Sequence, residues 1–100
     1  MVTLTLTRGR VAAVLARAAG LLEAEQWDAQ LNPLIGAIDR AADFVPGTGR
    51  TDAEAASLAA WDALAQHLGD EYPQEWERRA GRTQAEVVNA LRAAAKEVSA

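Results

Sequence analysis

The sequence contains no cysteine, a single lysine and few aromatic residues, and none of its hydrophobic runs is long. Without cysteine, these residues form no disulfide bond and no thiolate metal site. No stretch approaches the roughly 20 apolar residues that span a bilayer, and the apolar run before Arg17 is too short for a secretory signal. We therefore predict a cytoplasmic protein that has no membrane partner.

Positive charge is outweighed by negative charge, and the formal net charge is -4 at pH 7. Proteins that bind nucleic acids generally need clustered positive charge to displace counterions from phosphates. The charge balance therefore argues against a general nucleic-acid binder, although a local basic patch is compatible with it.

Alanine is abundant, with 24 of the 100 residues, and alanine has the highest helix propensity. One hundred residues are enough for one domain with one hydrophobic core. The predicted fold is all-α, a compact bundle of four to five helices. An extended N-terminal arm is expected over residues 1–7 and a single helical domain over residues 8–100.

The clearest helix lies near the C-terminus. Thr83 and Glu86 have the spacing of a capping box, in which each side chain accepts a hydrogen bond from the backbone amide of the other residue. Apolar residues then recur at helical spacing, so one face of this helix needs a packing partner. They are Val87, Val88, Leu91, Ala94, Ala95 and Val98.

Start and stop signals place the remaining helices. The expected helices cover about 8–26, 33–44, 52–68, 73–80 and 84–98. The start signals are Thr7, Asn32 followed by Pro33, and the pair Thr51 and Glu54, and the stop signals are Gly69 and Gly81.

Apolar residues on the inward faces of these helices form the predicted core. Three tryptophans are included because they lie at turns or on apolar stripes. The predicted core residues are Val11, Val14, Leu15, Ala18, Leu22, Trp27, Leu34, Ile35, Ile38, Leu58, Trp61, Leu64, Leu68, Trp76, Val87, Leu91 and Val98.

The first seven residues alternate between apolar and threonine side chains. Val2, Leu4 and Leu6 are the apolar members, and this period of two is typical of an extended segment with one apolar face. A lone strand leaves its backbone groups without partners. Residues 1–7 are therefore either a loose terminal arm, as is common at chain ends, or a contact that joins two copies in a homodimer.

Three patterns resemble functional motifs without completing them. Residues 47–51, Gly-Thr-Gly-Arg-Thr, resemble a phosphate-binding loop but lack the preceding strand and the lysine. His67, the only histidine, has no adjacent serine, cysteine or second histidine with which to catalyse a reaction or bind a metal. The acids around residues 70–77 point to a solvated surface, because their spacing spreads them around a helix. These acids are Asp70, Glu71, Glu75 and Glu77. We expect no enzymatic activity, no metal and no cofactor.

Several segments together resemble one family. They are Leu-Ile-Gly-Ala-Ile-Asp at 34–39, Trp76, and Gly-Arg-Thr-x-x-Glu-Val at 81–87 followed by Leu91-Arg-x-Ala-Ala. From about Val11 onward, the chain resembles an uncharacterised family of small proteins from actinobacteria and their phages. The resemblance implies a helical fold and a cytoplasmic location, and it implies no activity.

Two functional hypotheses remain. The first is a protein-interaction module that self-associates through Val2, Leu4 and Leu6 and binds a partner through a basic corner. The alternative is a helix-turn-helix nucleic-acid-binding protein, in which residues 74–80 support a recognition helix over residues 83–98. Both hypotheses assign contacts to the same residues, which are Arg78, Arg79, Arg82 and Gln84.

Overall fold

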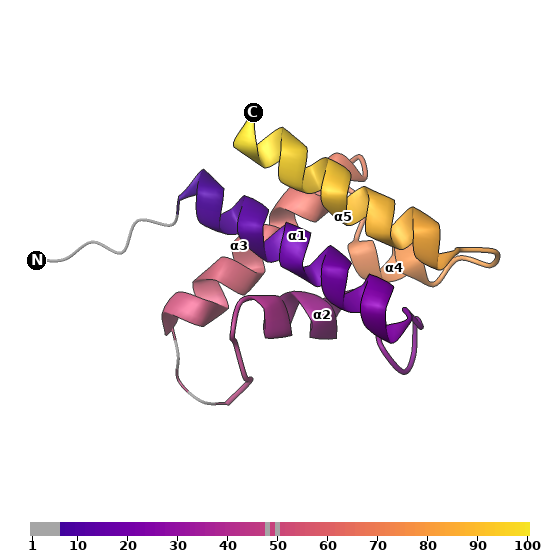
Figure 1. The fold of residues 1–100 in the computed structure, drawn as a ribbon, viewed down its shortest axis with the longest axis horizontal. Helices are drawn as coiled ribbons and strands as arrows, with labels where there is room; N and C mark the ends of the chain where they lie inside the picture. Colours follow the sequence, from indigo (N-terminus) through magenta and orange to yellow (C-terminus); the bar gives the residue numbers. More distant parts are fainter. Residues whose placement is uncertain (1–6, 48, 50) are drawn as a thin grey trace, which may run out of the picture.

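The computed structural model describes residues 7–47, 49 and 51–100. Within this part of the chain there are five α-helices and no strand, which confirms the predicted all-α bundle (Figure 1). The predicted contacts at Val2, Leu4 and Leu6 lie outside the described residues. The helices are α1 (Arg8–Glu25), α2 (Leu34–Ala41), α3 (Thr51–His67), α4 (Pro73–Glu77) and α5 (Gln84–Ser99).

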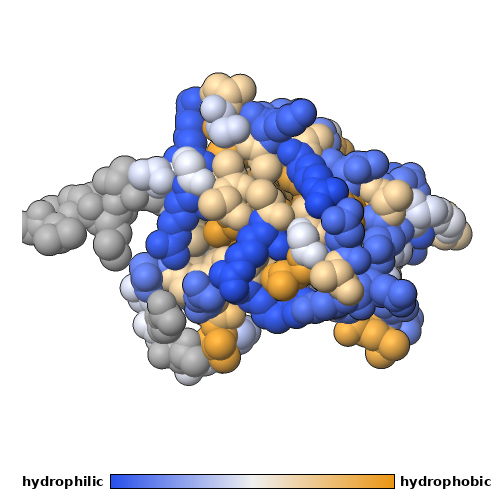
Figure 2. Space-filling view, viewed as in Figure 1, coloured by the Kyte–Doolittle hydropathy of each residue, from blue (hydrophilic) through white to orange (hydrophobic). Residues whose placement is uncertain are grey.

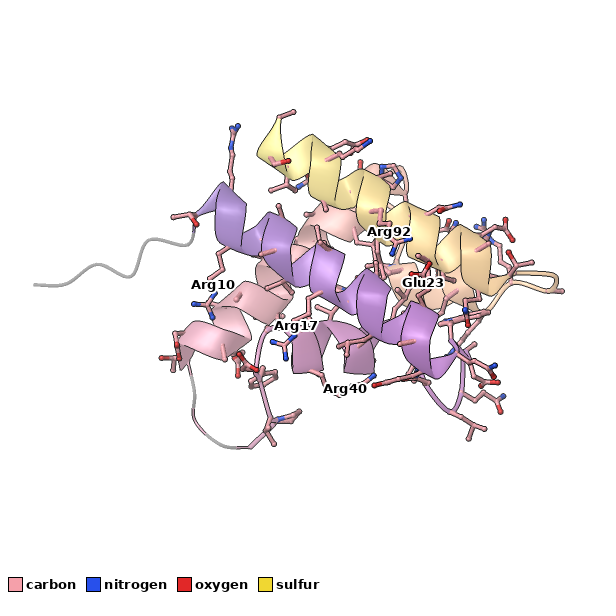
Figure 3. All side chains as sticks on the ribbon, viewed as in Figure 1. Arg10, Arg17, Glu23, Arg40 and Arg92 are labelled. Carbon is pink, nitrogen blue, oxygen red and sulfur yellow. The ribbon has the colours of Figure 1, made fainter. Side chains whose placement is uncertain are left out.

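The first and last helices form the principal pair of the bundle. In Figure 1, α1 and α5 run side by side across the front of the molecule, while α3 crosses behind α1. Leu15, Leu22 and Leu91 are completely buried at the centre of the core. On the outside, Arg92 of α5 faces Glu23 of α1 (Figure 3), and its guanidinium donates to both carboxylate oxygens at 3.0 and 3.1 Å.

Alanine provides much of the core where the other helices approach. Ala53, Ala56 and Ala60 line the buried side of α3, and Ala37 and Ala41 do the same on α2. Small side chains allow two helix axes to lie close together because little volume separates the backbones. The alanine content therefore contributes close packing as well as helix propensity.

At α1 and α5, side-chain caps begin the helices where the sequence predicts them. Helix α3 instead begins at Thr51 itself, so the prediction of Thr51 as the N-cap of a helix from residue 52 was wrong. Thr7 accepts a hydrogen bond from the Arg10 backbone amide at 3.1 Å, which confirms it as the N-cap of α1. Thr83 and Glu86 form the complete capping box of α5. The hydrogen bonds from the Thr83 amide and hydroxyl lower the pKa of the Glu86 carboxyl below its usual value.

The predicted start of α2 was wrong by one residue. Pro33, not Asn32, is the N-cap, and it supplies no side-chain hydrogen bond. The amide of Asn32 is used elsewhere: it donates to the Gln26 carbonyl and accepts from Arg40, at 3.0 Å in each case. Asn32 thus braces the α1–α2 turn instead of capping the helix.

Two helices are shorter than predicted. Helix α2 ends at Ala41 instead of residue 44, because Asp43 adopts a left-handed backbone with φ +59° and the Phe44 amide turns back to the Asp39 carbonyl. Helix α4 ends at Glu77 instead of residue 80. Gly81, with φ +83°, lies in the turn that follows α4.

Two predicted core residues lie at the surface. Ile35 is 50% exposed and Leu58 is 57% exposed, so their assignment to the core was wrong. Five others pack against the core while remaining partly exposed: Trp27, Trp61, Leu68, Trp76 and Val98. The other predicted core residues are buried.

Among the described residues, no helix combines the length and the apolar character that crossing a bilayer requires.

Candidate functional site

A groove runs between α2 and α3 and extends into the loop that connects them. Its volume is about 340 Å³ and its lining is mostly apolar. We call it the α2–α3 groove. Its lining residues are Ile35, Asp39, Phe44, Pro46, Glu54, Ser57, Leu58 and Trp61.

Helix α3 has an apolar stripe on two sides, and the second stripe forms one wall of the groove. The first stripe is the buried alanine face described above. The second contains Leu58 and Trp61, which lie three residues apart and so share a face of the helix. Ile35 of α2 stands opposite them across the groove. Leu58 and Ile35 are at least half exposed because no described element covers this side.

The groove also contains a polar pair. The Ser57 hydroxyl donates to Asp39 Oδ1 at 2.5 Å, and Ser57 is only 6% exposed. This hydrogen bond joins the last turn of α2 to the first half of α3. It therefore fixes the spacing of the two helices that form the groove walls.

The acidic side chains lie at one end of the groove. Asp39 is in the last turn of α2 and Glu54 is in the first turn of α3, so both are near the loop that joins these helices. Among the described residues, no cation bonds to either carboxylate. Ile35 and Trp61 are farther from this loop in the sequence. Their apolar side chains therefore line the other end of the groove.

The α2–α3 loop closes the acidic end with apolar residues. Phe44 is half-buried against the core, and Pro46 is exposed. In Figure 2, hydrophobic atoms stand out where this loop lies at the lower left edge and where the α1–α2 loop lies at the lower right edge. Much of the rest of this face is polar.

The residues of the predicted basic corner, which are Arg78, Arg79, Arg82 and Gln84, differ in how many contacts they make within the fold. Arg82 stacks over the Trp76 ring at 3.9 Å, donates to the Trp76 carbonyl and pairs with Glu86 at 3.0 Å. Arg79 pairs with Glu71. Arg78 is exposed.

Gln84 is half-buried, and its side chain makes a contact within the fold. Its Oε1 accepts a hydrogen bond from the Trp27 backbone amide at 2.7 Å. This bond ties the start of α5 to the turn after α1, where Gln26 has the left-handed φ of +70°. The side-chain oxygen of Gln84 therefore already accepts a hydrogen bond that stabilises this turn.

The prediction of a solvated Glu77 was wrong. Glu77 is 2% exposed, and its Oε2 accepts from the Trp27 indole nitrogen and from the Leu34 backbone amide, both at 3.0 Å. Leu34 is the first residue of α2, so a carboxyl group from α4 caps that helix. Burial raises the pKa of Glu77, and the hydrogen bonds from Trp27 and Leu34 oppose that effect.

The single histidine has one acidic neighbour. His67 Nδ1 lies 2.9 Å from Glu97 Oε1, which joins the end of α3 to α5. Within the part of the chain that the structure describes, no three side chains of the metal-binding types come together.

Comparison with protein families gives a match over most of the chain. The sequence profile of the family of unknown function DUF6197 matches residues 6–97. The chain belongs to this family. Neither the curated proteins nor the solved structures include a match.

Membership of DUF6197 confirms the predicted relation to a family without an assigned function, while an origin in actinobacteria or phages stays a prediction. The matched range contains every residue that lines the α2–α3 groove and all of α1 to α4. Residues 1–5, which include Val2 and Leu4, precede it.

Sequence reasoning missed the groove in this DUF6197 chain because it placed Ile35 and Leu58 in the core. The available signal was the second stripe of α3. A helix with alanines on one side and Leu58 and Trp61 on another has more apolar surface than one neighbour covers. The pairing of Asp39 with Ser57 had no signal in the sequence, because 18 positions separate the two residues.

Proposed function

We propose that this DUF6197 member is a protein-interaction module that binds a partner through the α2–α3 groove. The observation that carries the proposal is the exposure of Ile35 and Leu58, at 50% and 57%, on either side of an apolar groove that also contains Trp61. Contiguous exposed apolar surface on a small protein often marks a binding site. Tryptophan is also over-represented among residues that dominate binding energies.

The shape of the groove suits a small number of apolar side chains from a partner. Its walls are two helices whose separation is fixed by the hydrogen bond between Ser57 and Asp39. A preformed groove lowers the entropic cost of binding, because its own side chains need little ordering. Burying apolar area contributes about 25 cal/mol per Å², and part of this gain offsets the translational and rotational freedom lost on binding.

The nucleic-acid alternative has less support. It requires Arg82 and Gln84 to face a duplex, yet both side chains make hydrogen bonds within the fold. The apolar stripe of α5 is also buried against the rest of the bundle, so only its polar face is available for a groove of DNA. A gel shift at low salt tests this alternative, because phosphate contacts are strongest there.

The proposal is tested with peptides selected from a random displayed library against the immobilised chain. We expect selected peptides to bind in solution and Leu58→Glu to weaken them at least about tenfold, because a charge would replace an apolar contact in a desolvated groove. Titration calorimetry measures the dissociation constants.

Leu31→Glu is the matched control. Leu31 is 89% exposed, lies in the α1–α2 turn and does not line the groove. The same substitution there should leave the affinity unchanged. Selected peptides that bind both variants as well as the unmodified chain would place the contact surface elsewhere and contradict the proposal.

Self-association through Val2, Leu4 and Leu6 is a separate part of the proposal. It rests on the alternating sequence alone, since these residues lie outside the described part of the chain. Light scattering of the chain with and without residues 1–6 tests it: an unchanged mass would remove the arm from this role.

A further inference from the structure

We infer that the occupant of the α2–α3 groove is a cationic amphipathic helix of a partner protein. Its apolar residues pack on Ile35, Leu58 and Trp61, and a lysine or arginine one turn further along meets Asp39 and Glu54. This inference rests on the proposed function and adds the chemistry of the partner.

The two ends of the groove differ in chemistry, and a partner must match both. Its apolar end is formed by Ile35, Leu58 and Trp61, and its acidic end is formed by Asp39 and Glu54 near the α2–α3 loop. Asp52, also in the first turn of α3, adds negative charge near the same end. A partner with apolar residues alone could pack on Phe44 and Pro46 at this end, but it would offer no cation to Asp39 and Glu54.

Within the part of the chain that the structure describes, neither groove carboxylate pairs with a cation of the fold. Elsewhere in the described chain, exposed carboxylates such as Glu23, Glu25 and Glu86 pair with arginines of the fold. Among the described residues, the Asp39 carboxylate accepts only from the Ser57 hydroxyl, and no cation pairs with Glu54. Partner charges of opposite sign fix the orientation of a bound segment and speed its association.

The dimensions of the groove suit about two turns of helix. From Glu54 to Trp61 the wall covers eight residues of α3, and the seven steps between them give about 10 Å at 1.5 Å per residue. A partner helix presents side chains at that spacing through residues one and two turns apart. Two apolar residues and one cation therefore cover the groove from one end to the other.

The experiment uses three synthetic alanine-rich helical peptides. Each carries two leucines one turn apart, followed one turn later by arginine, glutamine or glutamate. The probe of binding is the Trp61 indole signal in nuclear magnetic resonance spectra, assigned with Trp61→Phe. We expect the arginine peptide to bind tightest, by about two- to fivefold over the glutamine peptide, as is usual for an exposed ion pair. Raising the salt concentration should reduce the difference.

Reversing the charge at Glu54 tests whether the charged residue of the peptide lies at the acidic end of the groove. Glu54→Lys should weaken the arginine peptide and strengthen the glutamate peptide, while Glu54→Gln should bring the arginine peptide close to the glutamine peptide. Glu75→Lys, the same change on the exposed side of α4, is the matched control and should alter none of the three.

The outcomes separate this inference from the proposed function. Peptides that bind with the same affinity whatever their charge, and that lose binding in Leu58→Glu, would overturn the cationic partner and leave the interaction module intact. No Leu58-dependent binding by these or by library-selected peptides would overturn both. A Leu58-dependent dimer in sedimentation, or a shift of the Trp61 signal by a peptide of residues 1–7, would assign the groove to a second copy or to the arm and overturn the inference.

Discussion

At the scale of single residues, Glu77 holds three segments together. One oxygen of its carboxyl group accepts from the Trp27 indole and from the first amide of α2, so α4 is tied to the turn after α1 and to the start of α2. The two donors are left without a partner if the carboxyl group is removed. A buried donor without a partner costs about 1–3 kcal/mol.

We expect Glu77→Ala to lower the free energy of unfolding by about 2–4 kcal/mol, because two donors lose their acceptor. Glu77→Gln should cost less, since the amide oxygen can still accept from both. Urea denaturation followed by circular dichroism measures the change. Glu75→Ala, an exposed neighbour on α4, is the control and should fall within about 0.5 kcal/mol of the unmodified chain. Equal losses in Glu77→Ala and Glu77→Gln would contradict the role of the acceptor.

Individual burial was only partly predictable from the sequence. The leucines and valines on single apolar stripes were placed in the core correctly, as Leu15, Leu22 and Leu91 illustrate. Glu77 was placed wrongly because a carboxylate is normally solvated, and its partners lie 50 and 43 positions away in the sequence. Periodicity along one helix carries no information about such distant partners.

At the scale of elements, α3 has two different apolar sides. Its alanine side is buried, with Ala56 and Ala60 completely inaccessible, and its other side forms the groove wall with Leu58 and Trp61. The buried side tolerates little extra volume because close-packed helices have no space between them.

Ala60→Leu should therefore destabilise the protein by about 1–3 kcal/mol, the usual cost of overpacking a core. Ala55→Leu, on the exposed side of the same helix, is the control and should change stability by less than about 0.5 kcal/mol, because alanine and leucine have similar helix propensities. Thermal unfolding monitored by circular dichroism distinguishes them. If Ala60→Leu were as stable as Ala55→Leu, the packing at the alanine face would be looser than described.

Helix starts were more predictable than helix ends. Thr7 and the pair of Thr83 with Glu86 carry their own caps, so the local sequence is sufficient to identify them. Helices α1 and α2 instead end at Glu25 and Ala41, just before Gln26 and Asp43, which have positive φ angles without being glycine. Tertiary contacts, such as the hydrogen bond from the Trp27 amide to Gln84 Oε1, stabilise the α1 end, and these contacts are not visible in a local pattern.

At the scale of the whole molecule, stability depends on pH through groups that shift in opposite directions. Burial raises the pKa of Glu77, so its proton is bound more tightly in the folded protein than in the unfolded chain. Hydrogen bonds lower the pKa values of Glu23, Asp28 and Glu86, so the ionised forms of these residues favour folding. Their contribution is present at neutral pH and is lost as the pH falls through their lowered folded-state pKa values.

The contribution of Glu77 to stability should change with pH in the opposite direction. Its protonated form favours folding below the ordinary glutamate pKa near 4.5, and this contribution is lost as the pH rises through the raised folded-state pKa. The stability of the unmodified chain relative to Glu77→Gln should therefore fall as the pH rises above about 4.5 and through the raised folded-state pKa of Glu77. Urea denaturation of both proteins across that range measures the difference. A difference that does not change with pH would contradict the shift.

The pairing of α1 with α5 affects how the chain folds during synthesis. Helix α1 is synthesised before the other four described helices, and its most extensive packing neighbour is α5, residues 84–99. The part of the α1 surface that α5 covers therefore stays exposed while residues 26–83 are translated, and exposed apolar surface of this kind makes a nascent chain prone to aggregate. Translation must reach α5 before the nascent domain can close.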